Sequence, residues 1–199
     1  MLKENPYDKP GLALDDAKLW GQIKAGERAG MEALYTKYTQ ELFRLGMSIK
    51  GDRSLVKDCI QDVFLQIWQY RHTIKATDNV KLYLFKCLSN KIHKEVGKDK
   101  KRYGHLDMEL ETEVEPDTGA GDSLMSSEQR ISLNNALSCL PSRQNEVILL
   151  LYYENHSYED ISKIMGINVQ SVYTLAWKAL ANLKKRMALA WFFLLAFLT

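Results

Sequence analysis

The sequence has few cysteines, histidines and prolines, and the reactive side chains that it does have form no catalytic or metal-binding pattern. Three cysteines and four histidines occur in 199 residues, and their spacing matches no zinc or redox motif. A glycine-rich loop of the kind that cradles phosphate is also missing. We therefore predict no catalytic residue, no metal site and no cofactor, and an enzyme is the least supported class of function.

The cysteines themselves, Cys59, Cys87 and Cys139, are odd in number and lie far apart within apolar helical patterns. This placement predicts three small buried side chains in a reducing compartment rather than disulfides. The N-terminus lacks the apolar core of a signal peptide, so we expect a cytoplasmic protein.

The sequence also lacks a large excess of positive or negative side chains, because the net charge is only +2. The distribution of charge is nevertheless uneven. Residues 86–102 contain seven basic and two acidic side chains, and residues 103–128 contain eight acidic side chains with no Lys or Arg. The basic block can serve nucleic-acid binding or be an ordinary solvated helix face. Such a division describes surfaces and partners rather than the fold.

Strand patterns are nearly absent, and helical periodicity divides the chain into two parts. We predict an all-α fold of two small helical bundles joined by a flexible acidic linker. Asp15, Ser54 and Asn79 are the predicted N-caps of helices in the first bundle. The predicted segments are a loose N-terminal arm (1–14), a first bundle (15–102), the linker (103–127), a second bundle (128–187) and a hydrophobic tail (188–199).

Residues 157–187 have the pattern of a helix-turn-helix followed by a basic stem. Ser157 and Asp160 have the capping-box spacing, Gly166 suits a turn that needs positive φ, and Asn168 can cap the second helix. The predicted inward stripe of that helix is Val172, Leu175 or Ala176, Ala179 and Leu183. Its opposite face carries Gln170, Ser171, Tyr173, Thr174, Trp177 and Lys178. This geometry can place a recognition helix in the DNA major groove, although an ordinary helical hairpin has a similar pattern.

The first bundle contains two further surfaces of interest. Asp58 and Asp62 share a helix face with Gln61, and their like charges cost about 0.2–0.5 kcal/mol. That face is either simply solvated or the landing site of a basic partner. The inward stripe of the same helix is predicted to be Val56, Ile60, Val63, Phe64 and Ile67, joined by Trp68.

The next helix, residues 81–102, interleaves aromatic and basic side chains. Tyr83 and Phe85 alternate with Lys86, Asn90 and Lys94, a combination that suits single-stranded nucleic acid because bases stack on rings while lysines meet phosphates. The alternative is ordinary core packing, which we expect for Leu84 and Leu88.

Taken together, these segments resemble bacterial extracytoplasmic-function (ECF) RNA polymerase sigma factors of the sigma-70 family. The resemblance to region 2 rests on Ala33-Leu34-Tyr35 with Tyr38, on Asp58-x-x-Gln61-Asp62-Val63-Phe64-Leu65-x-x-Trp68, and on Tyr83-Leu84-Phe85 with Asn90. The resemblance to region 4 rests on Leu140-Pro141, Val147, Ser157-Tyr158-Glu159-Asp160-Ile161, Met165-Gly166-Ile167 and Ser171-Val172.

The resemblance implies a subunit that binds core RNA polymerase through its β and β′ subunits, recognises and melts promoter DNA, and starts transcription of a regulated gene set. The implied polymerase-binding residues are Asp58, Gln61, Asp62, Phe64 and Trp68. Those implied for the −10 element and melting are Arg71, His72, Tyr83, Lys86, Asn90 and Lys94. Those implied for the −35 element are Val169, Gln170, Ser171, Tyr173, Thr174, Trp177 and Lys178. An anti-sigma factor, soluble or membrane-bound, is the implied regulator.

The chain also departs from the family pattern. Many members carry Arg or Lys after the residue pair that corresponds to Ser171-Val172, whereas Tyr173 and Thr174 follow here. Gln170 to adenine, Thr174 or Tyr173 to phosphate, and Lys178 to phosphate are then the remaining candidate contacts. A rival interpretation is a helix-turn-helix regulator that never binds polymerase, but it leaves the Asp58/Asp62 face without a purpose.

The family pattern does not require the C-terminal tail. Residues 188–198 carry no charge, and a helix of that length measures about 17 Å, which is too short to cross a bilayer core of about 30 Å. Such a tail packs on one of the bundles, docks in a membrane-bound anti-sigma factor, or lies on the membrane surface. From the sequence alone we favour a protein partner, either the regulator or the chain's own first bundle.

Overall fold

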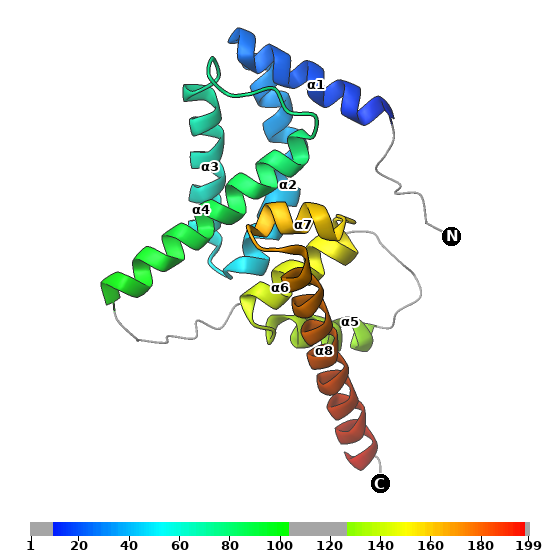
Figure 1. Cartoon of the computed structure of the whole chain (residues 1–199). Coiled ribbons are helices and arrows are strands. Elements are labelled where there is room, and N and C mark those ends of the chain that lie inside the picture. The colour runs from blue at the N-terminus through cyan, green and yellow to red at the C-terminus, as the bar shows by residue number, and fades with distance from the viewer. Residues whose placement is uncertain (1–9, 104–126, 198–199) are drawn as a thin grey trace.

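The computed structural model describes residues 10–103 and 127–197, and within them every regular element is a helix. The first domain consists of α1 (Pro10–Ala25), α2 (Arg28–Ile49), α3 (Arg53–Gln69) and α4 (Val80–Tyr103). The second consists of α5 (Ser127–Ser138), α6 (Ser142–Ile148), the π-helix η1 (Leu149–Tyr153), α7 (Tyr158–Met165) and α8 (Val169–Phe197). The all-α prediction is confirmed (Figure 1). The predicted arm up to residue 9 and the linker from 104 to 126 lie outside the described residues.

Local capping chemistry sets several helix starts as the sequence predicted. The side-chain oxygen of Asn79 accepts a hydrogen bond from Leu82 N at 2.8 Å at the start of α4. Ser157 Oγ accepts from Asp160 N at 3.1 Å at the start of α7, and Asn168 Oδ1 accepts from Ser171 N at 2.7 Å at the start of α8. Each of these caps satisfies a backbone N–H that has no partner within its helix.

Two predicted helix starts are wrong. Asp52 rather than Ser54 caps α3, because its carboxylate accepts from both Ser54 N and Leu55 N at 3.0 Å. Helix α1 begins at Pro10 rather than at Asp15, and proline suits a first helical turn because its missing N–H would have no helical partner there.

The core of the first domain depends on a close approach of α2 and α3. Gly46 is buried, and a Cβ at this position would lie 2.4 Å from Val56 Cγ1. The predicted inward stripe of α3 is confirmed, since Val56, Ile60, Val63, Phe64 and Ile67 are all buried. Among the cysteines only Cys59 is buried, so the prediction of three buried thiols is wrong for half-buried Cys87 and exposed Cys139.

The helix-turn-helix of the second domain has the predicted geometry. Gly166 takes the left-handed conformation (φ 64°) between α7 and α8. The inward stripe of α8 uses Ala176 rather than Leu175, which is half-buried. The remaining buried positions of that stripe are Val172, Ala179 and Leu183.

The two domains pack directly on each other in the described structure. Helix α7 lies against α4, and α6 lies against α2. The N-terminal half of α8 lies against α5, α6 and α7, and its C-terminal part points away from the other helices (Figure 1). In the part of the chain that is described, none of the helices has both the length and the apolar character needed to cross a membrane.

Candidate nucleic-acid and protein interfaces

The outer face of α3 presents the predicted polymerase-binding residues. Asp58 and Gln61 are exposed, and the side chain of Asp62 is 50% exposed. Lys91 Nζ of α4 lies 2.6 Å from Asp62 Oδ2, and this hydrogen bond raises the pKa of Lys91. The repulsion between the two aspartates is therefore reduced by a lysine of the same chain, and Asp58 keeps the more open carboxylate.

Phe64, one of the predicted contact residues, faces the core of the first domain. Its side chain is 6% exposed and its ring packs edge-on against that of Tyr35 at a centroid distance of 5.0 Å. Position 64 belongs to the same buried stripe as Ile60 and Ile67, and its role in polymerase binding stays a prediction. Its neighbour Leu65 is 49% exposed and supplies the apolar centre of the α3 face instead.

The segment between α3 and α4 is held by aromatic side chains. The Arg71 guanidinium lies over the Trp68 ring at 4.6 Å and donates to the Trp68 carbonyl at 2.8 Å. Trp20 Nε1 donates to the Lys75 carbonyl at 3.2 Å and so fixes the loop to α1. His72, predicted to act near the −10 element, is exposed on this loop.

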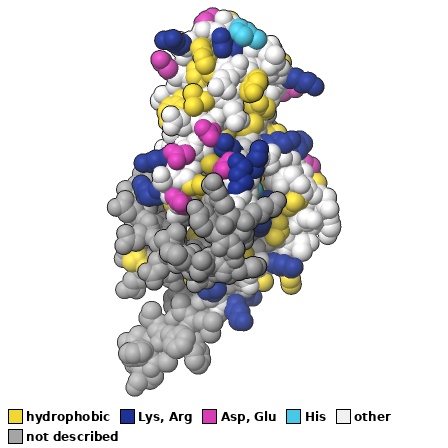
Figure 2. All heavy atoms as spheres, turned by 90° about the vertical axis from the view of Figure 1, so that its left-hand side faces the viewer, with side chains coloured by type: hydrophobic (Ala, Val, Ile, Leu, Met, Phe, Trp, Pro, Cys, Tyr) yellow, Lys and Arg dark blue, Asp and Glu magenta, His cyan; other side chains and the backbone are white. Residues whose placement is uncertain are grey.

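Helix α4 has two faces with different environments. Lys86, Asn90 and Lys94 lie along its solvent-exposed side, as predicted. Tyr83 is half-buried against the Trp20 ring, and burial raises its pKa to about 12. Phe85 is fully buried in this packed arrangement, with its ring against that of His156, so it is not open to a base while the domains are packed together. Figure 2 views the side that carries α3 and α4, and shows exposed hydrophobic side chains among charged ones in the first domain.

The exposed side of α8 carries the predicted −35 residues. Gln170, Tyr173, Thr174, Trp177 and Lys178 are exposed, whereas Val169 and Ser171 are half-buried. The ring of Tyr173 stacks on that of Tyr158 at a centroid distance of 3.9 Å, which fixes its direction. The Thr174 hydroxyl donates to the Gln170 carbonyl at 2.9 Å. Trp177 is 71% exposed, the most open large hydrophobic side chain among those described.

Sequence reasoning missed a polar network between the domains. Glu154, 3% exposed at its side chain, accepts hydrogen bonds from Lys81 Nζ at 2.7 Å and Arg44 Nη2 at 3.3 Å. Lys81 also lies 3.0 Å from Glu41 Oε2. Burial opposes the charged ammonium, but the two glutamates outweigh it and raise the pKa of Lys81.

A second buried glutamate also joins the two domains. The carboxylate of Glu146 is fully buried and accepts from Ser89 Oγ at 2.6 Å, and its other oxygen lies 3.0 Å from His93 Nε2. Arg143 Nη1 of its own helix is 3.4 Å away. An acidic residue directly before the apolar run that begins at Val147 and Ile148 was the one signal in the sequence for this contact.

His156 lies near the Glu154 network, since the charges of Lys81 and Glu154 act on its ring. Its ring packs edge-on against Phe85 at a centroid distance of 5.3 Å, and Nε2 is buried without a hydrogen-bond partner. Burial, together with the charge of Lys81, lowers the pKa of His156 to about 4. The packed arrangement therefore requires a neutral imidazole.

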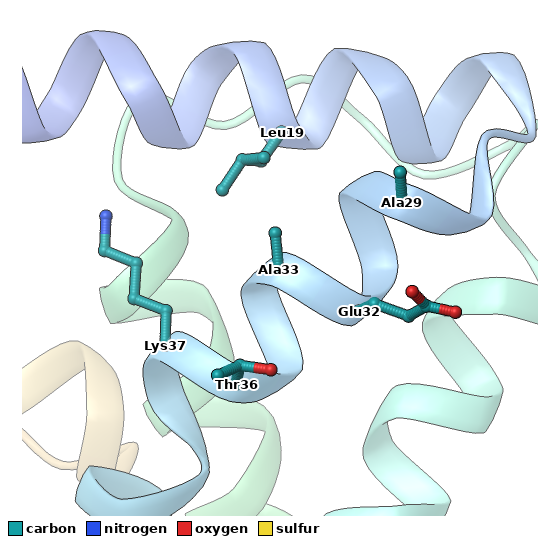
Figure 3. A pocket seen from close by; sticks show the side chains of 6 residues that line it. All are labelled: Leu19, Ala29, Glu32, Ala33, Thr36 and Lys37. Atoms are coloured by element: carbon teal, nitrogen blue, oxygen red, sulfur yellow. The ribbon is translucent and has the colours of Figure 1, made fainter.

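A surface hollow of about 550 Å³ lies between α1 and α2 (Figure 3). Small and apolar side chains line most of it, with Glu32 and Lys37 at its edge. Lys37 Nζ bonds to Asp16 at 2.6 Å. Over the described ranges no cluster of three or more His, Cys, Asp or Glu side chains could hold a metal ion.

Comparison with known families assigns both domains. The family pattern described as Sigma-70 region 2 matches residues 34–102, and that described as Sigma-70, region 4 matches residues 130–183. The chain is 22% identical over 182 residues to the ECF RNA polymerase sigma factor SigK of Mycobacterium ulcerans, covering 88% of this chain and 95% of that protein. It is 23% identical over 158 residues to the ECF sigma factor SigM of Bacillus subtilis, covering 77% and 93%.

Solved structures have the same fold. The sigma factor RpoE of Bartonella quintana, crystallised with the anti-sigma factor NepR, superposes with a TM-score of 0.62 at 20% identity, covering 79% of this chain and 96% of that one. CnrH, in complex with the cytosolic domain of CnrY, gives a TM-score of 0.60 at 19% identity, covering 87% and 97%.

Proposed function

The chain belongs to the sigma-70 family as an RNA polymerase sigma factor of the ECF type, and we propose that its exposed helix faces divide the work of initiation. The observation that carries this division is the presence in one chain of three separate open faces, on α3, on α4 and on α8. A helix-turn-helix regulator that acts without polymerase needs the last of these and has no use for the first two.

The face of α3 is proposed to bind core RNA polymerase. Asp58 and Gln61 offer oxygen acceptors beside the exposed side chain of Leu65, with Trp68 held by Arg71 at the end of the helix. An apolar side chain flanked by carboxylates suits a partner surface that is basic at its rim and apolar at its centre.

The face of α4 and the loop before it are proposed to act at the −10 element. Lys86 and Lys94 can neutralise phosphates, and Asn90 between them can hydrogen-bond to an extruded base. Extrusion of a base costs a few kcal/mol, so a surface that captures unpaired bases lowers the free energy of the melted promoter. Tyr83 is half-buried against Trp20, so we expect it to contact a base through the edge of its ring rather than to stack on it with a fully open face.

The face of α8 is proposed to bind the −35 element as duplex DNA. Gln170 lies in the first turn of the helix, where a recognition helix meets base edges, and Lys178 lies two turns further on, where it can reach phosphate.

Initiation also requires the two domains to separate. The −35 and −10 elements are separate stretches of one DNA molecule, which rises about 3.4 Å per base pair, whereas a globular body of this chain length is about 40 Å across and so spans only about twelve base pairs. Residues 104–126 can span up to about 75 Å when extended. We infer that the packed arrangement held by Glu146 and Glu154 is a closed form that opens when polymerase and promoter bind.

The proposed partners are core polymerase through its β and β′ subunits, promoter DNA and an anti-sigma factor. The last is supported by the solved structure of RpoE of Bartonella quintana, which was crystallised with the anti-sigma factor NepR. A protein with these partners acts in the cytoplasm, and its role is that of an initiation subunit rather than of an enzyme.

The test of the proposed function is reconstituted transcription. Core polymerase is supplied with the chain and a pool of promoter fragments, and transcript start sites are mapped. We expect initiation from a defined subset of promoters that core polymerase alone does not use. DNA binding without any gain in initiation, at any ratio of chain to core, would favour the regulator alternative.

A further inference from the structure

The C-terminal end of α8 has no role in any of the faces described above. The helix continues to Phe197, well past the DNA-binding residues, and extends away from the rest of the molecule (Figure 1). Among the side chains of α8 that the structure describes, the last buried one is Leu183, and Met187 packs partly buried against the same core. Three exposed cations follow Leu183, namely Lys184, Lys185 and Arg186, and after them residues 187–198 read Met-Ala-Leu-Ala-Trp-Phe-Phe-Leu-Leu-Ala-Phe-Leu without a polar side chain.

The composition of this segment distinguishes between two binding partners, a groove on a protein and a lipid bilayer. A helix that docks in a protein groove has one apolar face and one polar face. Every position from 187 to 198 is apolar, so a helix of these residues has no polar face to leave in water. Apolar surroundings on all sides are what hydrocarbon provides, and a contiguous apolar surface of this size is rare on a protein exposed to water.

The charge before this segment and the length of the segment also favour a lipid bilayer. The three cations lie at the boundary between the folded domain and the apolar segment, and basic residues at such a position are attracted to anionic lipid headgroups. The uncharged residues 188–198 form about 17 Å of helix, close to half of a bilayer core of about 30 Å.

We propose that the C-terminal segment of α8 is a membrane-surface anchor that inserts into one leaflet of an anionic bilayer, with Lys184, Lys185 and Arg186 at the headgroups. The sequence alone favoured a protein partner for this tail. Its apolar composition on every side and its extension away from both domains favour lipid instead. The anchor would hold the sigma factor at the cytoplasmic surface of the membrane, independently of any protein regulator.

The experiment is flotation of the full chain with vesicles of phosphatidylethanolamine and phosphatidylglycerol, with neutral phosphatidylcholine vesicles in parallel. We expect the full chain to float with the anionic vesicles and a chain lacking residues 188–199 to remain unbound. Changing Lys184, Lys185 and Arg186 to Gln should lower partitioning about 100-fold, since each basic residue near an anionic surface contributes about fivefold. The variant K18Q/R28Q/K57Q, which removes the same charge from exposed sites on the first domain, should bind like the unchanged chain.

Depth of insertion is measured with brominated phospholipids, which quench tryptophan fluorescence. Quenching is expected in the full chain and should be lost in Trp191→Leu, which keeps the segment apolar and should still float. Three results would each overturn the proposal: full chain that stays unbound with anionic vesicles, flotation that survives removal of the tail, or tail-dependent oligomers that do not bind vesicles. Transcription without vesicles is measured on the same preparations, so a failure of the anchor is distinguished from a failure of the sigma-factor assignment.

Discussion

Lys81 in the first turn of α4 donates a hydrogen bond to Glu154 at the end of η1 over 2.7 Å, joining residues 73 positions apart and linking the two domains. Arg44 of α2 reaches the other oxygen of the same carboxylate at 3.3 Å. Glu154 thus accepts hydrogen bonds from cationic side chains on α2 and α4 of the first domain. Removal of its charge should therefore weaken the contact between the two domains.

The first prediction follows from this arrangement. Glu154→Gln should destabilise the closed form by about 3 kcal/mol, the low end of the range for breaking a buried ion pair, because Lys81 keeps Glu41 as a partner. Small-angle scattering should show a larger radius of gyration, and thermal unfolding a lower midpoint. Lys163→Ala, which removes an exposed pair with Asp160, serves as the control and should change stability by less than about 1 kcal/mol. An unchanged radius of gyration in Glu154→Gln would show that this pair does not hold the domains together.

The second prediction concerns pH. Burial and the charge of Lys81 lower the pKa of His156 to about 4, so the closed form favours the neutral ring. As the pH falls, His156 is therefore protonated at a higher pH in an open or unfolded chain than in the closed form. The contribution of His156 to stability is therefore full above about pH 6.5 and is lost as pH falls toward 4. At pH 5 the loss should reach about 1–2 kcal/mol.

Thermal midpoints measured between pH 7.5 and 5 test this expectation. His156→Gln, which cannot titrate, should flatten the decline, whereas His72→Gln, on an exposed loop, should not. Glu154 and Asp160 also act on the ring, and the pH range stays above the usual titration of carboxylates. Equal slopes for His156→Gln and the unchanged chain would rule out His156 as the titrating group.

The third prediction concerns polymerase. Asp58→Arg should weaken binding of core polymerase about tenfold or more through charge reversal on an exposed site, with helical content unchanged. Leu65→Asp should act in the same direction because it places a charge at the apolar centre of the face. Asp62 is less suitable for this test since it pairs with Lys91. Affinity is measured with labelled chain and purified core, and Glu32→Arg, exposed on α2, is the control. Wild-type affinity in both α3 variants would exclude this face.

The fourth prediction separates base readout from phosphate contact on α8. Lys178→Ala should lower affinity for all promoters alike and reduce the salt slope by about one unit. Gln170→Ala should instead change the ranking of −35 variants, since a glutamine can bond bidentately to adenine. Both are measured with the polymerase complex on a panel of promoter fragments. A ranking that Gln170→Ala leaves intact removes this residue from base recognition.

The fifth prediction concerns the first domain's core. Gly46→Ala would place a Cβ 2.4 Å from Val56 Cγ1, and overpacking of this kind costs about 1–3 kcal/mol. Gly97→Ala in α4 has no neighbouring atom within 4 Å and should stabilise the helix by about 0.5–1 kcal/mol. Chemical denaturation of the two variants should therefore move the midpoint in opposite directions. A neutral Gly46→Ala would mean that α2 and α3 can separate without loss.

Local chemistry was readable from the sequence where neighbouring residues decide it. The caps at Asn79, Ser157 and Asn168 and the left-handed turn at Gly166 depend on side chains within a few positions. The start of α3 was predicted wrongly because two polar residues in close succession could both cap the helix. The choice between Asp52 and Ser54 depends on the backbone path before the helix.

The sequence by itself determined the helices, their order, the helix-turn-helix and the family, because these follow from periodicity, capping and short motifs. The tertiary structure alone decided which faces stay open. Phe64 and Leu65 are adjacent and both apolar, yet one is buried against Tyr35 and the other is exposed. Phe85 lies beneath the second domain, and Glu146 and Glu154 bind the first. Burial of these residues depends on contacts between helices that lie far apart in the chain, and periodicity within one helix carries no information about them.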